Sequence, residues 1–196
     1  MLRNGSEEWS RNWKDLRRIL LSPSVGRFGT TAIDGSRTMQ GPFRRMLLRV
    51  QYPPPNGIIK INFDGATFAE ENAAGIRVIA RSSNGTCVGW RKRLLPFKAA
   101  PEHCEMLAAA TAVFFGKEKG WNHVMIEGDC LLVITKLTNE DQDFSTLGNL
   151  VQDIKNNSKD FSFCRFIHVP REANILAHRL ARDANSNSDG DDVPIT

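Results

Sequence analysis

The feature that most constrains this chain is a run of three strand patterns between residues 59 and 94. In the first, Ile59, Ile61 and Phe63 alternate with polar residues, which is the period of a β-strand. Between the second and the third stands Asn84-Gly85, a pair that tight hairpin turns favour because both residues tolerate positive φ. Short connections of this kind predict an antiparallel meander. The predicted strands cover residues 59–64, 74–81 and 86–94.

After the meander, the pattern changes to helices that alternate with strands. A long helix is predicted from Pro101, which suits a first turn, to Lys119, where Gly120 suits the end. Helical crossovers make later strands parallel to a neighbour. The fold class is therefore α/β, a mixed five-stranded sheet with strands 1–3 antiparallel, strands 4 and 5 parallel, and helices on both faces. The later elements are a strand at 124–127, helices at 130–137 and 146–157, a strand at 161–169 and a helix at 172–184.

Charge divides the chain into a domain and its extensions. Residues 1–56 hold ten Lys or Arg and four Asp or Glu, a net charge of +6, whereas residues 57–196 have a net charge of −2. We expect a basic, mostly flexible extension at 1–56 with a possible short helix at 6–21, a domain at 57–184, and a disordered acidic tail at 185–196. A basic arm either binds nucleic-acid phosphates or is merely solvated, and its charge fits both.

Composition narrows the classes of protein that the chain can belong to. No apolar run approaches the roughly 18 residues of a membrane span. The first residues lack an apolar signal core, so we expect an intracellular protein of the nucleus or cytoplasm that is not secreted. Four cysteines are spread along the chain without a CxxC pair, which favours reduced thiols over a zinc site.

Three acidic residues stand where the predicted elements bring their side chains together. Asp64 ends the first strand, Asp129 follows the fourth, and Glu105 lies on the first turn of the long helix. Taken singly, each could be a turn former or a helix N-terminal charge. Three carboxylates at one point repel one another unless cations neutralise them, and such oxygen ligands suit Mg²⁺. Two such ions would activate a water and stabilise the leaving oxygen of a phosphodiester.

The sequence resembles a known family in four segments, which are PPPNGIIKINFDGAT, HCEMLAAATAV, HVMIEGDC and FIHVPREANILAHRLARDA. With these it is similar to the ribonuclease H domain, and most of all to the plant reverse-transcriptase-like version of non-LTR retroelements and their derived genes. The resemblance covers about 130 of the 196 residues. It implies a hydrolase that cuts the RNA strand of an RNA–DNA hybrid with two divalent ions, Mg²⁺ or Mn²⁺.

The resemblance also assigns roles to single residues. It implies that Asp64, Glu105 and Asp129 are catalytic and bind the metal ions. His168 matches a loop histidine linked to proton transfer and product release. Asn174 matches an asparagine that opens the last helix, and we expect it to contact nucleic acid together with Gly65.

The sequence departs from the family at two places. His178 stands where the family has its fourth acid, so it is either a metal ligand that suits Mn²⁺ better than Mg²⁺ or a partly buried histidine without that role. The basic protrusion of several family members is replaced by the acidic segment 138–145. The remaining basic candidates for nucleic-acid binding are the N-terminal arm and the third strand, where Arg91 and Arg93 either contact nucleic acid or belong to a solvated strand end.

These observations leave three hypotheses for the function. The first is an RNA–DNA hybrid endoribonuclease, which the three acids and His168 favour. The second is a catalytically weakened nucleic-acid-binding module derived from a retroelement, which His178 favours. The third is a protein-interaction module that reuses the fold. We expect a monomer with nucleic acid as its partner and no contact with a membrane.

Overall fold

The computed structural model describes residues 53–68, 70, 72–141, 143, 145–174 and 190–192. The possible helix at 6–21, most of the basic extension, His178 and nearly all of the predicted last helix lie outside these residues. In the part of the chain that is described, none of the helices is both long and apolar enough to cross a membrane.

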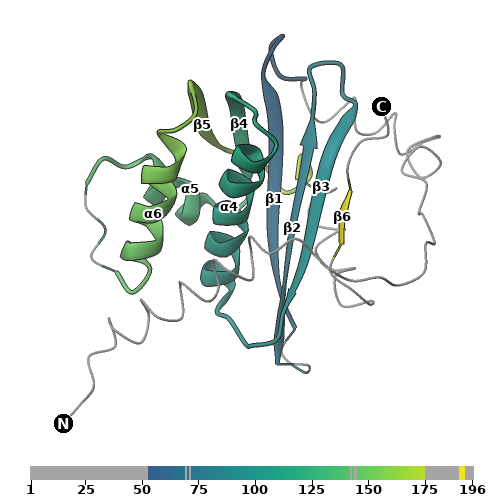
Figure 1. Cartoon of the computed structure of the whole chain (residues 1–196). Helices are drawn as coiled ribbons and strands as arrows, with labels where there is room; N and C mark the ends of the chain where they lie inside the picture. Colours follow the sequence, from purple (N-terminus) through teal and green to yellow (C-terminus); the bar gives the residue numbers. More distant parts are fainter. Residues whose placement is uncertain are drawn as a thin grey trace.

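In the part of the chain that the structure describes, six strands form one sheet in the order β5-β4-β1-β2-β3-β6 (Figure 1). The first three strands pair antiparallel, and β4 is parallel to both β1 and β5. The predicted meander and the two predicted parallel strands are thereby confirmed. The strands are β1 (Ile59–Phe68), β2 (Ala73–Arg81), β3 (Cys87–Leu95), β4 (His123–Gly128), β5 (Phe163–His168) and β6 (Gly190–Asp192).

The hairpin between β2 and β3 closes where the sequence predicts, but with a different geometry. Gly85 has a φ of 81°, whereas Asn84 does not have positive φ. The Gly85 N–H donates to the Ser82 carbonyl over 2.9 Å, as in a turn that ends in a left-handed glycine. Asn84 contributes through its side chain instead, because its Oδ1 accepts a hydrogen bond from the Thr86 N–H over 3.0 Å.

Among the described residues, one face of the sheet is covered by the helices α4 (Pro101–Glu118), α5 (Leu131–Thr138) and α6 (Gly148–Ser158). The longest, α4, crosses β1, β2 and β4 and packs against α5 and α6 (Figure 1). Its small residues allow a close approach, and a Cβ on Gly116 would lie only 3.2 Å from the Ile61 side chain. Of the helix predicted at 172–184, only the first three residues are described.

The prediction of a disordered tail at 185–196 is wrong for Gly190–Asp192, which forms β6 and pairs antiparallel with β3. Asp191 lies opposite Arg91, and Asp192 lies opposite Trp90. Without β6, β3 would be an edge strand with unpaired backbone donors and acceptors, which are a template for another strand. Pairing of this kind uses backbone groups, so the polar sequence of the tail carries no alternating pattern that would reveal it.

Candidate metal centre

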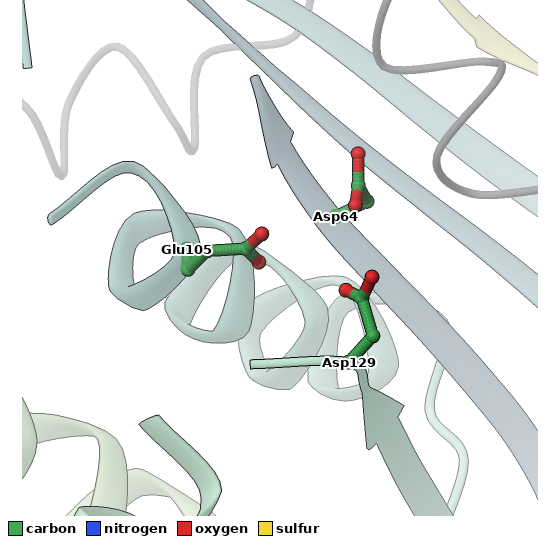
Figure 2. Close-up of side chains that lie close together, drawn as sticks. All are labelled: Asp64, Glu105 and Asp129. Atoms are coloured by element: carbon green, nitrogen blue, oxygen red, sulfur yellow. The ribbon is translucent and has the colours of Figure 1, made fainter. Parts of the chain in front are cut away.

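The three acidic residues that the sequence predicts to converge do so in the structure (Figure 2). Asp64 lies on β1, Asp129 directly follows β4, and Glu105 reaches toward both from α4. One carboxylate oxygen from each lies within 4.8 Å of the other two. β4 runs parallel to β1 and pairs with it only over Ile59–Asn62. Asp64 therefore lies within β1, four residues before its end rather than at its end as predicted, and meets Asp129 where β4 stops and β1 continues.

Gly65 is the residue that lets α4 come close enough to place Glu105 in the cluster. A Cβ at Gly65 would lie 2.6 Å from the Cys104 carbonyl carbon and 2.8 Å from the Glu105 backbone nitrogen, shorter than real contacts allow. Only glycine therefore fits between β1 and the first turns of α4. The expected contact between Gly65 and nucleic acid stays a prediction.

The electrostatics of the cluster suit a divalent cation. Burial, reinforced by the negative charge of Asp129, raises the pKa of Asp64 to about 8. Burial, reinforced by Asp64 and Asp129, raises the pKa of Glu105 to about 9. Glu105 Oε2 is buried, and no donor among the described residues reaches it. Carboxylates that destabilise one another's charge and keep an oxygen available are the ligands that Mg²⁺ and Mn²⁺ prefer, so these residues fit such an ion.

The buried side chain of Asn174 holds the Asp129 carboxylate through a hydrogen bond. Its Nδ2 donates to Asp129 Oδ1 over 3.2 Å and to the Phe63 carbonyl over 2.8 Å. The Asn174 side chain is fully buried, which contradicts the expectation that it contacts nucleic acid. These hydrogen bonds join the loop after β5 to the middle of β1 and to the residue that follows β4. Sequence reasoning missed Arg171, whose exposed side chain places Nε 3.5 Å from Asp129 Oδ2.

His168 lies at the rim of the cluster. It is the last residue of β5, and its Nε2 is 3.3 Å from the Asp129 backbone carbonyl oxygen. The side chain is exposed, so a molecule that approaches the carboxylates can reach it. Its expected role in proton transfer stays a prediction, and the metal role of His178 falls outside the described residues.

Arg91 and Arg93 are the predicted nucleic-acid contacts that the structure contradicts. Their exposed fractions are 2% and 1%, so neither side chain can contact a phosphate or form a solvated strand end. Arg91 instead donates to both carboxylate oxygens of Glu118, over 3.0 and 2.9 Å, and its guanidinium lies 5.0 Å from the centre of the Phe115 ring. Both residues alternate into the face of β3 that α4 covers, where long side chains are packed rather than solvated.

Sequence reasoning also missed a set of buried polar and charged side chains beside the cluster. They belong to Lys60, Asn62, Arg81 and Glu127. The polar positions of β1 alternate with apolar ones, which is the pattern of a strand with one solvated face. Glu127 could have been recognised from the sequence as a buried charge, because it is the one charged residue in the otherwise apolar segment VMIEG. An acid in the middle of a buried strand requires partners, and Lys60 Nζ lies 2.8 Å from Glu127 Oε1.

The model of one protein family, described as reverse transcriptase-like, matches residues 62–184. The chain belongs to the reverse transcriptase-like family. The match begins within β1 and runs past the last described residue of the loop after β5, so it includes the meander except the first three residues of β1, the three described helices and the three acids of the cluster. No curated protein sequence matches this reverse transcriptase-like chain at a significant level.

Solved structures with the same fold are ribonucleases H. Ribonuclease H1 from the archaeon Halobacterium salinarum superposes with a TM-score of 0.62 at 23% identity, covering 67% of this chain and 99% of its own. The N-terminal ribonuclease H domain of a Mycobacterium tuberculosis protein superposes with a TM-score of 0.60 at 20% identity. The superposition covers 66% of this chain and 94% of that domain's chain. LC11 ribonuclease H1, solved in complex with an RNA/DNA hybrid, superposes with a TM-score of 0.56 at 20% identity. The superposition covers 64% of this chain and 94% of the LC11 chain. This reverse transcriptase-like chain therefore has the fold of the ribonucleases H.

Proposed function

We propose that the chain is an endoribonuclease that cuts the RNA strand of an RNA–DNA hybrid with two divalent cations. The observation that carries the proposal is the convergence of Asp64, Glu105 and Asp129, whose carboxylate oxygens lie within 4.8 Å of one another beside β1 and the end of β4 in a sheet with the fold of ribonuclease H. The similarity to a ribonuclease H1 that was solved with an RNA/DNA hybrid supports the substrate class. The four motifs quoted above support descent from a plant non-LTR retroelement.

Each residue of the cluster has a distinct part in this proposal. Asp64, Glu105 and Asp129 would hold the ions, and Asn174 keeps Asp129 in place through its hydrogen bond. Cations bound there supply an activated water and stabilise the leaving oxygen of the phosphodiester. His168, exposed at the rim, is placed to accept or donate a proton at its imidazole. The products would be a 3′-hydroxyl and a 5′-phosphate.

Substrate binding has to come from residues other than Arg91 and Arg93, because both are buried. Arg171 is exposed beside Asp129 and is placed to contact a phosphate close to the cut. The segment 1–56, with a net charge of +6, would supply attraction to the backbone that does not depend on sequence. The 2′-hydroxyl of the RNA strand would mark the strand to be cut.

Cleavage of a labelled RNA–DNA hybrid, in Mg²⁺ and separately in Mn²⁺, tests the proposal. We expect stronger cleavage in Mn²⁺, because His178 replaces a fourth acid and a nitrogen ligand favours Mn²⁺. His178→Asp should then raise the rate in Mg²⁺. Asp64→Asn should abolish cleavage in both ions, which separates turnover by this chain from a contaminating nuclease.

The second candidate is a nucleic-acid-binding module with weakened catalysis, which the histidine at position 178 favours. It predicts tight binding of the hybrid without cleavage in either ion. Efficient cleavage in Mg²⁺ that His178→Asp leaves unchanged would instead show that three carboxylates suffice. Cleavage that survives Asp64→Asn would contradict the proposed site.

A further inference from the structure

We propose that Asn62 is a positioning residue of the metal centre, which orients Asn174 and through it Asp129. This inference rests on the metal binding proposed above and adds a residue that touches no ligand of the metal. Asn62 lies on β1 two residues before Asp64, and Glu127 lies on β4 two residues before Asp129. Since side chains alternate along a strand, Asn62 lies on the same face of β1 as Asp64, and its partner in the register, Glu127, comes just before Gly128 and Asp129.

The hydrogen bonds of Asn62 join three strands and the loop after β5. Asn62 Nδ2 donates to Glu127 Oε2 over 3.1 Å and to Asn174 Oδ1 over 3.2 Å. Asn62 Oδ1 accepts from Arg81 Nη2 over 2.7 Å. Glu127 in turn is paired with Lys60, whose Nζ lies 2.8 Å from Oε1. The side-chain amide of Asn62 is thus the junction of β1, β2, β4 and the residue that holds Asp129.

The charges around Asn62 fix which end of its amide faces Asn174. In the opposite orientation, the amide oxygen would face the Glu127 carboxylate and the NH₂ group would face the Arg81 guanidinium, so both contacts would become repulsive. Asn62 is 1% exposed and Glu127 is 4% exposed, so water does not relieve such a mismatch. The NH₂ group of Asn62 is therefore held toward Asn174.

The orientation of Asn62 determines that of Asn174. Because Asn174 Oδ1 accepts from Asn62, its NH₂ group points to Asp129 Oδ1 and to the Phe63 carbonyl. If the side-chain amide of Asn174 were flipped, its oxygen would face the Phe63 carbonyl oxygen and Asp129 Oδ1, which are both acceptors. Asn62 thus selects the orientation in which Asn174 holds one oxygen of the Asp129 carboxylate. Partners of metal ligands act in this way, and losing one usually costs about 10- to 100-fold in metal affinity.

The test is calorimetric titration of the full chain with Mn²⁺, comparing wild type with Asn62→Leu. Leucine has a similar size but neither donates nor accepts, so the variant should bind Mn²⁺ at least about 10-fold more weakly. Thr111→Val is the matched control, because Thr111 is equally buried and loses one hydrogen bond, to the Leu107 carbonyl within α4. The control should bind Mn²⁺ within about twofold of wild type, since any effect of lower stability alone would appear in it as well.

A second measurement uses only the wild-type chain and therefore does not depend on the folding of a variant. Titration with Mg²⁺ should shift the side-chain amide signals of both Asn174 and Asn62 in nitrogen–proton NMR spectra. The side-chain amide of Asn157, which donates to the Asp153 carbonyl on α6, should not move. A shift at Asn174 without one at Asn62 would overturn the inference.

The outcomes separate the inference from the proposed function. If wild type binds no Mn²⁺, the proposed metal centre fails and the inference fails with it. If wild type binds Mn²⁺ and folded Asn62→Leu binds it equally well, only the inference is overturned. If Asn62→Leu and Thr111→Val weaken binding to the same extent, the effect is one of stability and Asn62 has no positioning role.

Discussion

At the scale of single residues, the cluster shows how surroundings change the chemistry of an ordinary carboxylate. Asp64 and Glu105 have pKa values raised to about 8 and about 9, chiefly because burial disfavours their charged forms. Arg171 lowers both values, but it acts across an exposed position and offsets only a part of the shift. Protons and divalent cations therefore compete for the same oxygens near neutral pH.

The raised pKa values of Asp64 and Glu105 predict that the metal-free chain loses stability as the pH rises from about 4 to about 9. Below the usual carboxyl pKa values of 3.8 and 4.5, both groups are protonated in the folded and the unfolded chain, and burial costs little. At higher pH the unfolded chain releases protons that the folded chain keeps, so the cost grows until the pH passes the folded pKa values. Urea unfolding of the metal-free chain at several pH values measures this fall in the free energy of unfolding.

Glu105→Gln is the variant that checks the cause. Glutamine has nearly the same shape and carries no charge, so the metal-free variant should gain about 1 kcal/mol or more over wild type at pH 9 and little at pH 4. The same variant should lose affinity for Mn²⁺. A gain that does not change with pH would mean that the stability difference has a source other than the charge of Glu105.

At the scale of elements, the sequence pattern predicts β1 to β5 and the acidic cluster, but it predicts neither β6 nor the side-chain contacts around the cluster. Alternation at Ile59, Ile61 and Phe63 predicted β1, and the order of elements placed the three acids together. The burial of Arg91 could not be predicted, because it depends on Glu118 and Phe115 of a helix that arrives later in the chain. The polar positions of β1 resembled a solvated face for the same reason, since their partners come from β2 and β4.

The contact between β1 and α4 yields a prediction about Gly65. Gly65→Ala adds one methyl group where the Cys104 carbonyl carbon would be 2.6 Å away, so strand and helix must separate at the cluster. Overpacking of this kind usually costs about 1–3 kcal/mol. The variant should therefore have a lower free energy of unfolding in urea and a weaker affinity for Mn²⁺.

Thr67→Ala is the control for this substitution, because Thr67 is an exposed residue of the same strand. It should leave both quantities close to the wild-type values. If Gly65→Ala binds Mn²⁺ as wild type does while losing stability, the close approach supports the fold but does not place Glu105.

At the scale of the whole molecule, charge is separated along the chain rather than spread over it. The domain that holds the acidic cluster belongs to a sequence segment with a net charge of −2, and the preceding 56 residues carry +6. An acidic site that binds a polyanion needs attraction from elsewhere, and the N-terminal segment is the part of the sequence with a net positive charge. Arg91 and Arg93 are buried and therefore do not supply this attraction at the surface of the domain.

Deleting residues 1–50 should accordingly weaken binding to an RNA–DNA hybrid and flatten its dependence on salt, because fewer counterions are released. Fluorescence anisotropy at several salt concentrations gives both quantities. Deletion of residues 193–196, which contain no charged side chain, is the control and should change neither. A truncated chain that binds as tightly, with the same salt slope, would show that the segment 1–50 is not the electrostatic anchor.

The most direct test of the metal centre is a crystal structure of the chain grown with Mn²⁺, with the anomalous signal of manganese used to locate the ions. The predicted result is Mn²⁺ bonded to carboxylate oxygens of Asp64, Glu105 and Asp129, and loss of that signal in Asp64→Asn. Manganese bound only elsewhere, or a cluster that binds none at saturating Mn²⁺ with Glu105 turned to solvent, would contradict the account.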